Sequence, residues 1–285
     1  MAIGDITLSR SARANVLALA GTTRSLDTVQ QRLATGKKVN SAMDNPTVYF
    51  TARGFMDTAN AVQLIKDSLG TAIQTIKAAT DALSSIDMLI QNAQGLAVKA
   101  LQSGTDTAAT QVLGQQYDAL LTQIRNLATD ATFNGTNLLS GTGQDLTVNF
   151  DPQNTASGLT IQSVDYASTT GTLAGSMGTA STNGWASAGT LQANIQTDQT
   201  KLTNALALIR SQAASFGSNS TIITARSDFS TNLVNTLTVA SDNLTLADMN
   251  EEGANATTLQ TRQQLGVISL SISGQAAQAV LRLFG

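Results

Sequence analysis

Residues 62–100 read VQLIKDSLGTAIQTIKAATDALSSIDMLIQNAQGLAVKA, and apolar side chains recur along them at alternating spacings of three and four residues. The residues between the repeat positions are mostly Asp, Gln, Asn, Lys, Ser and Thr. An apolar repeat of 3.5 residues forms one stripe along a long helix, and a partner helix must cover that stripe. We therefore predict a coiled-coil seam that packs within the chain. Its larger members are Val62, Ile65, Leu69, Ile76, Leu83, Ile86 and Ile90.

Helical periodicity also occurs on both sides of this stretch. Leu19, Leu26 and Leu33 are spaced by seven residues near the start of the chain. The dipeptide Asn45-Pro46 predicts a turn, because the residue before a proline avoids the helical conformation. We expect helices over residues 1–35, 58–102, 107–130, 187–247 and 259–284.

Residues 131–190 have a different character, since they are rich in Gly, Thr, Ser and Asn and contain few bulky apolar side chains. Alternating runs at 146–150 and 159–164 predict two short strands bounded by turns. Because helices precede and follow this region, the chain should run out and return. The predicted fold class is mainly α: a long antiparallel coiled-coil helix bundle, a small β-hairpin and loop region in the middle, and paired N- and C-terminal helices.

The same pattern predicts two domains. Residues 1–40 and 253–285 would form an inner domain of terminal helices, and residues 41–252 a helical rod that includes the β region. Glu251 and Glu252 lie at the expected break before the last helix, where we expect both carboxylates to be solvated.

Composition excludes several classes of function. The 285 residues include no cysteine and no histidine, which removes disulfides, thiolate or imidazole metal sites, and Cys-His or Ser-His catalysis. A net charge of −3 without a basic cluster gives no footprint for nucleic acid, and no run of 18 apolar residues could span a membrane. We expect no enzymatic activity, no catalytic, cofactor-binding or metal site, and no nucleic-acid or membrane partner.

Three separated segments carry a resemblance to a known family. Residues 33–46, LATGKKVNSAMDNP, resemble the stretch LSSGxRINSAxDDxA, and residues 132–139, TFNGTNLL, resemble TxFNGxxLL. Residues 259–284 begin LQTRQQLG and end VLRLF, which is similar to the terminus QTRQQLGxxSLSxANQAxQxVLxLF. The chain therefore resembles bacterial flagellin, in a short form without large outer domains.

This resemblance implies a function and a set of partners. Flagellins are exported unfolded by the flagellar type III apparatus and polymerise into the extracellular filament used for motility. The implied partners are other copies of the chain, an export chaperone, the filament cap and hook-junction proteins. The terminal helices should be loose in a monomer and become ordered in the polymer. The residues we assign to self-assembly are Leu19, Leu26, Leu33, Leu265, Ile268, Ile272, Val280, Leu283 and Phe284.

A further segment is compared with a stretch that an innate immune receptor of the Toll-like class reads in many flagellins. That stretch is LQRVRELAVQ, whereas residues 90–99 here read IQNAQGLAVK. Arginine is suited to such an interface because it offers a charge and several donors. Without these arginines, we predict weak or absent recognition. The diverged segment comprises Gln91, Asn92, Gln94, Gly95 and Leu96.

Two alternative functions stay open at the level of sequence. A hook–filament junction protein would share the paired terminal helices, although its C-terminus usually lacks the QTRQQLG-type match. A secreted coiled-coil effector would explain the heptads but not the three ordered segments.

Overall fold

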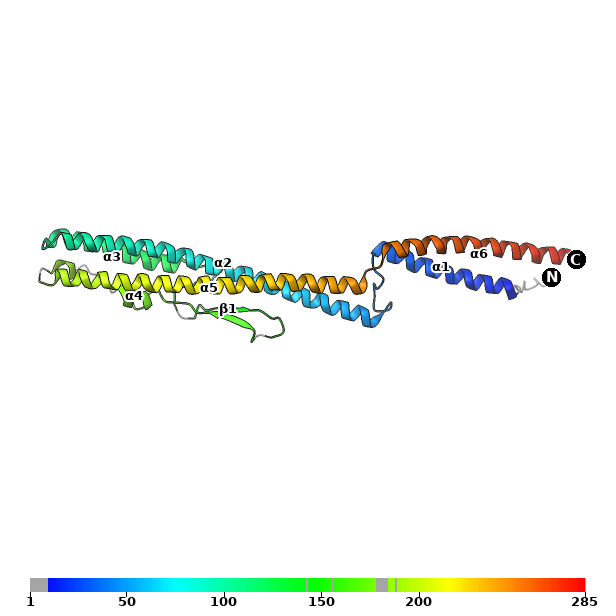
Figure 1. Cartoon of the computed structure of the whole chain (residues 1–285), viewed down its shortest axis with the longest axis horizontal. Coiled ribbons are helices and arrows are strands. Elements are labelled where there is room, and N and C mark those ends of the chain that lie inside the picture. The colour runs from blue at the N-terminus through cyan, green and yellow to red at the C-terminus, as the bar shows by residue number, and fades with distance from the viewer. Residues whose placement is uncertain (1–9, 142, 155, 178–183, 188, 285) are drawn as a thin grey trace, which may run out of the picture. The chain divides into compact units, whose positions relative to one another are not determined.

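The computed structural model describes residues 10–141, 143–154, 156–177, 184–187 and 189–284 (Figure 1). Most of the described chain is helical, and an antiparallel hairpin lies in the middle of the sequence. The predicted fold class is therefore confirmed. In chain order the elements are α1 (Arg10–Thr35), α2 (Pro46–Gln102), α3 (Thr107–Asp130), β1 (Leu146–Asn149), β2 (Gly158–Ile161), α4 (Thr172–Met177), η1 (Gly184–Ala186), α5 (Leu191–Thr245) and α6 (Met249–Phe284).

The chain divides into two compact units. The first comprises Met1–Thr58 and Thr236–Gly285, and the second comprises Ala59–Asn235. Helices α2 and α5 each contribute residues to both units. None of the described helices combines the length and the hydropathy that crossing a membrane requires.

The core of the second unit forms where α2, α3 and α5 pack together. The seam residues of α2 are buried, apart from the half-buried Ile65: Val62, Leu69, Ile76, Leu83, Ile86 and Ile90. Helix α5 contributes a second heptad series that is almost fully buried: Ile195, Leu202, Ile209, Phe216 and Ile223. At about 1.5–3 kcal/mol for each large apolar side chain, these two stripes supply the main stabilisation of the unit.

Helix starts are set by capping side chains. The Asp106 carboxylate accepts hydrogen bonds from the backbone N–H groups of Ala108 and Ala109, both at 3.1 Å, and α3 begins as predicted at Thr107. The prediction that α2 begins near residue 58 is wrong, since α2 begins at Pro46. Proline lacks only an N–H that the first helical turn leaves unsatisfied, and Asn45 Oδ1 accepts from the Val48 N–H at 3.2 Å.

The hairpin lies where predicted, and a turn precedes it. Strands β1 and β2 pair with Val148 opposite Leu159, and Val148 and Ile161 are buried in the core of the second unit. At the preceding turn, Asn134 and Gly135 have φ values of 49° and 80°. Two positive φ values in succession are what a type I′ turn requires, and glycine reaches them without steric cost.

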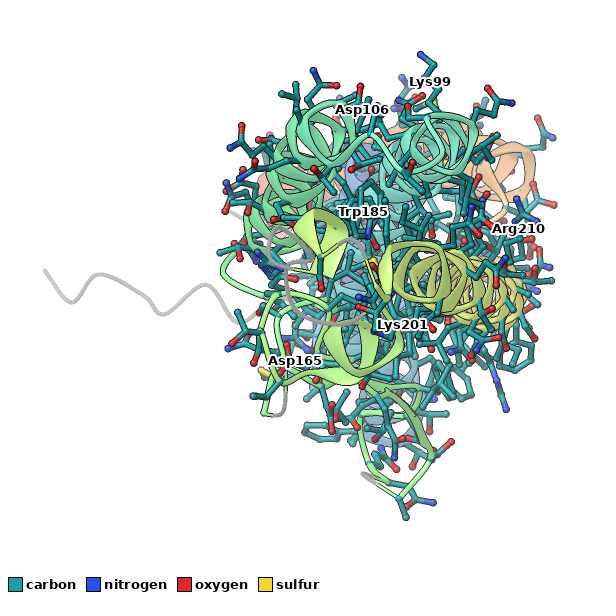
Figure 2. All side chains as sticks on the ribbon, turned by 90° about the vertical axis from the view of Figure 1, so that its left-hand side faces the viewer. Lys99, Asp106, Asp165, Trp185, Lys201 and Arg210 are labelled. Carbon is teal, nitrogen blue, oxygen red and sulfur yellow. The ribbon has the colours of Figure 1, made fainter. Side chains whose placement is uncertain are left out.

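Trp185, the chain's one tryptophan, ties the segment after the hairpin to the helices of the second unit. Its indole Nε1 donates to Asp198 Oδ2 at 2.9 Å, and its carbonyl accepts from Thr110 Oγ1 at 2.9 Å. Its ring lies against Tyr117, with 5.0 Å between the ring centroids. Figure 2 shows Trp185 in the interior, with Lys99 and Arg210 at the rim.

In the first unit, α6 begins earlier than predicted. Asp248 Oδ1 accepts from the backbone N–H groups of Asn250 at 2.9 Å and Glu251 at 3.3 Å, so the helix starts at Met249. Glu252 therefore lies in the first turn of α6, not at a break. Glu252 is also buried, and its Oε1 pairs with Arg32 Nη1 at 2.9 Å. This contradicts the expectation of a solvated carboxylate.

Candidate assembly interface

Helices α1 and α6 form an antiparallel pair in the first unit (Figure 1). Asn15 Nδ2 donates to Ser269 Oγ at 3.2 Å, and Gln263 Nε2 donates to Thr23 Oγ1 at 3.5 Å. Farther along, Arg32 meets Glu252. Residue numbers rise along α1 as they fall along α6 in these three contacts. The antiparallel pair therefore keeps one register over its described length.

The inner faces of the pair pack through a narrow seam. Leu26 is buried, and Leu19 and Leu33 on the same face are half-buried. At Gly266 the helices approach closely, because an added Cβ would lie 3.2 Å from Leu19 Cδ1. The three α1 leucines that we assigned to self-assembly therefore lie on the face that packs against α6.

The outer face of α6 is apolar and uncovered. Leu265, Ile268 and Ile272 are 60%, 54% and 61% exposed, and their spacings of three and four residues place them in one stripe. Val267 is also exposed, and a shallow hollow of about 510 Å³ is lined by Gln263, Gln264, Val267 and Ile268. The structure describes the helix backbone at Val280, Leu283 and Phe284 but not their side chains.

Helix α1 adds two exposed apolar side chains that sequence reasoning missed. Val16 and Leu17 are 41% and 71% exposed. Both lie between the heptad positions of α1, and the heptad pattern includes only the residues that pack against α6. A search for apolar residues outside that stripe would have found them.

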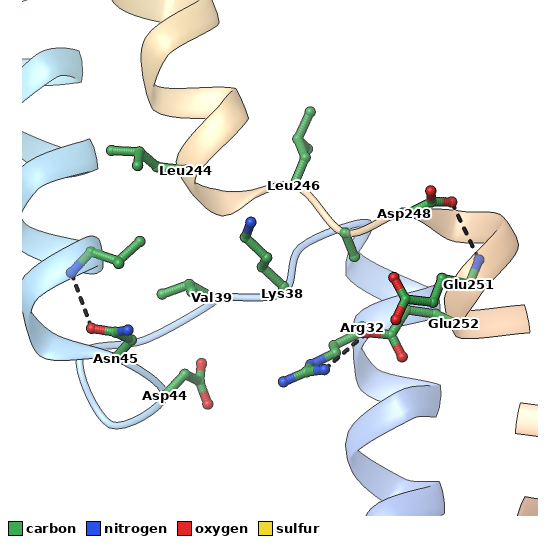
Figure 3. Close-up of a pocket in the computed structure, with 12 residues that line it drawn as sticks. Arg32, Lys38, Val39, Asp44, Asn45, Leu244, Leu246, Asp248, Glu251 and Glu252 are labelled. Atoms are coloured by element: carbon green, nitrogen blue, oxygen red, sulfur yellow. Dashed lines mark hydrogen bonds and ion pairs between the residues drawn. The ribbon is translucent and has the colours of Figure 1, made fainter. Parts of the chain in front are cut away.

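A short backbone ladder holds together the two segments that lead into α1 and α6. Lys38 N–H donates to the Thr245 carbonyl at 2.7 Å, and Ala247 N–H donates to the Gly36 carbonyl at 2.9 Å. Gly36 has a φ of 70°, which ends α1 at little steric cost. Figure 3 shows this region, where Arg32, Lys38, Glu251 and Glu252 surround a pocket.

Hydrogen bonds within the loop between α1 and α2 hold the Asp44 carboxylate in place. Its Oδ2 accepts from the backbone N–H groups of Ser41 and Asn40, both at 2.9 Å, and from Ser41 Oγ at 3.2 Å. The backbone hydrogen bonds from Ser41 and Asn40 lower the pKa of this exposed carboxyl below its ordinary value of 3.8. They order the loop between α1 and α2.

The diverged receptor-like segment lies on α2 in the second unit. Gln91, Asn92 and Gly95 are exposed, whereas Gln94 and Leu96 are half-buried. Gln94 Nε2 donates to Thr203 Oγ1 on α5 at 3.3 Å. The adjacent Asp87 accepts hydrogen bonds from Gln91 and, at 3.0 Å, from Arg210 Nε. The exposed side chains of the segment are therefore small or uncharged.

The described side chains do not form a cluster that could bind a metal ion. Among residues 10–141, 143–154, 156–177, 184–187 and 189–284, no three Asp or Glu side chains come together as a metal site would need.

Two family matches cover most of the sequence. Residues 7–144 match the bacterial flagellin N-terminal helical region, and residues 199–284 match the bacterial flagellin C-terminal helical region. Flagellins FljK and FljO of Caulobacter vibrioides are 34% and 33% identical to the chain over the full length of both proteins. A flagellin of Brucella melitensis is 25% identical over 99% of both chains.

Among solved structures, the crystal structure of Bacillus cereus flagellin matches 57% of this chain and 88% of its own. The TM-score is 0.48 at 22% sequence identity. The family relationship rests on the sequence matches.

Proposed function

Since the chain belongs to the bacterial flagellin family and is a structural, non-enzymatic subunit of the extracellular flagellar filament, we propose that the outer face of α6 carries its subunit contacts. The members of this α6 outer face are Leu265, Val267, Ile268 and Ile272. The relatives that match over the whole length are flagellins, so the hook-junction and effector alternatives are not retained.

The observation that supports this proposal is the exposure of large apolar side chains on a helix whose inner face already has a partner. Burying such a side chain yields about 1.5–3 kcal/mol, and a contiguous exposed apolar patch marks an interaction site. A neighbouring copy in the filament is the partner available to every subunit. On this proposal Leu19, Leu26 and Leu33 act indirectly, because they hold α6 in place against α1.

The predicted division into domains follows the same logic. We propose that residues 1–40 with 253–285 form the inner domain of the filament, and that residues 41–252 form the rod outside it. We also propose that Val280, Leu283 and Phe284 contribute to subunit contacts near the C-terminal end of α6.

The other expected partners also belong to this proposal. An exposed α6 outer face would need cover before assembly, which favours an export chaperone that binds it in the unassembled subunit. The filament cap and the hook-junction proteins would meet the same face at the two ends of the filament.

The test is a pair of polar substitutions on the α6 outer face. The variant Ile268→Ser/Ile272→Ser should stay helical by circular dichroism but need at least about tenfold more protein to polymerise on filament seeds, because two apolar contacts are lost. The matched control is Val112→Ser on α3, a position with 54% exposure. Polymerisation of the double variant at the same critical concentration as the control would refute the proposal.

A further inference from the structure

The apolar seam between α1 and α6 is poorly suited to fix how the two helices align along their length. In the observed register Leu19 lies against Gly266, where the helices approach closely. A shift of α6 by one heptad would bring Gly266 to Leu26, because the leucines of α1 recur every seven residues. The same shift would bring the half-buried Leu259 to Leu33. Apolar packing alone would therefore tolerate the shifted register.

Charge is what distinguishes the two registers. Glu252 occupies the seam position of α6 one heptad before Leu259, and its carboxylate pairs with Arg32 at 2.9 Å (Figure 3). The side chains of Arg32 and Glu252 are 37% and 9% exposed, whereas every other described charged side chain of the two helices is exposed. The one-heptad shift would carry Glu252 past the end of α1 at Thr35 and separate it from Arg32.

The environment of Glu252 is more typical of a specificity device than of a stabilising contact. Its Oε1 accepts from Arg32, but its Oε2 is buried and has no hydrogen-bond partner among the described residues. Taking a carboxylate out of water without satisfying both oxygens is unfavourable. A buried ion pair is therefore weak as a source of stability, and its best-attested role is to favour one arrangement of helices over others.

From this geometry we propose that the Arg32–Glu252 pair selects the register in which α6 packs on α1. One heptad corresponds to about 10 Å along a helix, so the register decides where along the subunit the α6 outer face is presented. This consequence for assembly rests on the proposed function of that face. The choice of register itself does not, and it can be measured in a single chain.

Disulfide trapping can measure the register because the chain contains no cysteine of its own. Asn15→Cys/Ser269→Cys joins two positions whose side chains are in contact in the observed register. Asn15→Cys/Ala276→Cys reports the register that is shifted by seven residues. In dilute monomer under mild oxidation the disulfides form within one chain. The first pair should form at least about tenfold faster than the second, because the shift breaks the buried ion pair.

Charge reversal then tests the ion pair. Arg32→Glu and Glu252→Arg should each lower this ratio of rates to about one or below, because each places like charges together in the observed register. The exchange Arg32→Glu/Glu252→Arg should raise the ratio again and restore seeded polymerisation with it. Arg24→Glu, which reverses an exposed charge of α1 outside the seam, is the matched control and should leave the ratio unchanged.

The backbone ladder between Gly36 and Ala247 is the rival explanation for the register. If both single reversals keep the ratio of the unsubstituted chain, the ladder holds the register and the inference is overturned. A ratio in the exchanged variant that is no higher than in the single reversals would overturn it as well. A failure of the proposed function would instead appear as unimpaired polymerisation of Ile268→Ser/Ile272→Ser, and would leave these ratios unaffected.

Discussion

At the scale of single residues, Asp198 is a buried carboxylate whose hydrogen bonds stabilise the second unit. It is buried, and its two carboxylate oxygens accept from the Trp185 indole at 2.9 Å and from Lys201 Nζ at 3.2 Å. Removing it leaves a buried indole N–H without an acceptor, which costs about 1–3 kcal/mol.

We therefore expect Asp198→Ala to lower the free energy of unfolding by about 2 kcal/mol or more. Asp198→Asn should lower it less, because the amide oxygen can still accept from the indole. The measurement is urea unfolding followed by tryptophan fluorescence, which reports on Trp185 alone. Asp130→Ala, at an exposed position at the end of α3, is the control and should change little. Equal stability of Asp198→Ala and this control would contradict the assignment.

Asp44 gives a prediction about pH at the same scale. Its pKa is lower in the folded chain than its ordinary value of 3.8. Its contribution to loop stability is therefore complete above the ordinary pKa and is lost as the pH falls through the lowered one. Asp44→Asn should speed amide exchange at Asn40 and Ser41 at pH 7. The difference from the unsubstituted chain should shrink as the pH falls below about 4, through the lowered pKa of Asp44. A difference that is constant across this range would contradict the role of the carboxylate charge.

At the scale of elements, α1 and α6 differ from the helices of the second unit in how they are covered. Within the second unit, helices α2 and α5 bury most of their heptad stripes in a core shared by three helices. The described parts of α1 and α6 bury one seam between them, and even Leu19 and Leu33 stay half-buried there. Ordering a residue costs about 1–2 kcal/mol in backbone freedom, so a seam this narrow makes the pair marginal.

Amide exchange should reveal this difference. In monomers, residues 10–35 and 259–284 should exchange quickly, whereas residues 69–97 of α2 should be protected. In filaments both sets should be protected, because neighbouring copies cover the terminal helices. Equal protection of the terminal helices in monomer and filament would show that assembly does not order them.

At the scale of the whole molecule, recognition of the chain by an outside receptor would depend on the receptor-like segment of α2. The receptor-like segment presents Gln91, Asn92 and Gly95 to solvent, and no basic side chain occurs among them. We predict weak recognition by the Toll-like receptor that reads arginine-bearing flagellins.

Restoring the missing charges tests this prediction. The variant Asn92→Arg/Gln94→Arg/Gly95→Glu should raise a receptor reporter response by about tenfold or more, since arginine contacts often dominate such interfaces. A control with the same charges on α3, Gln115→Arg/Gln116→Arg/Ala119→Glu, should respond like the unsubstituted protein. Full potency of the unsubstituted chain would refute the prediction.

Much of the fold follows from the sequence because it depends on local repetition. The 3.5-residue period from Val62 to Ala100 sets which face of α2 is buried, whatever helix covers it. The family relationship is also a property of sequence, as the segments around Asn134-Gly135 and Gln260–Gly266 illustrate. The starts of α2 and α6 were misplaced because a cap depends on how one side chain meets the backbone of the next turn, as Asn45 and Asp248 do.

Only the tertiary structure could decide the state of Glu252. In the sequence it is one of two adjacent glutamates before a glycine, and such residues are usually solvated. In the fold it is buried because Arg32, 220 residues away in the chain, lies across the α1–α6 pair. Burial and charge pairing depend on distance in space. The heptad period of α2 is written into consecutive residues, whereas the pocket around Glu252 exists only once two distant segments have come together.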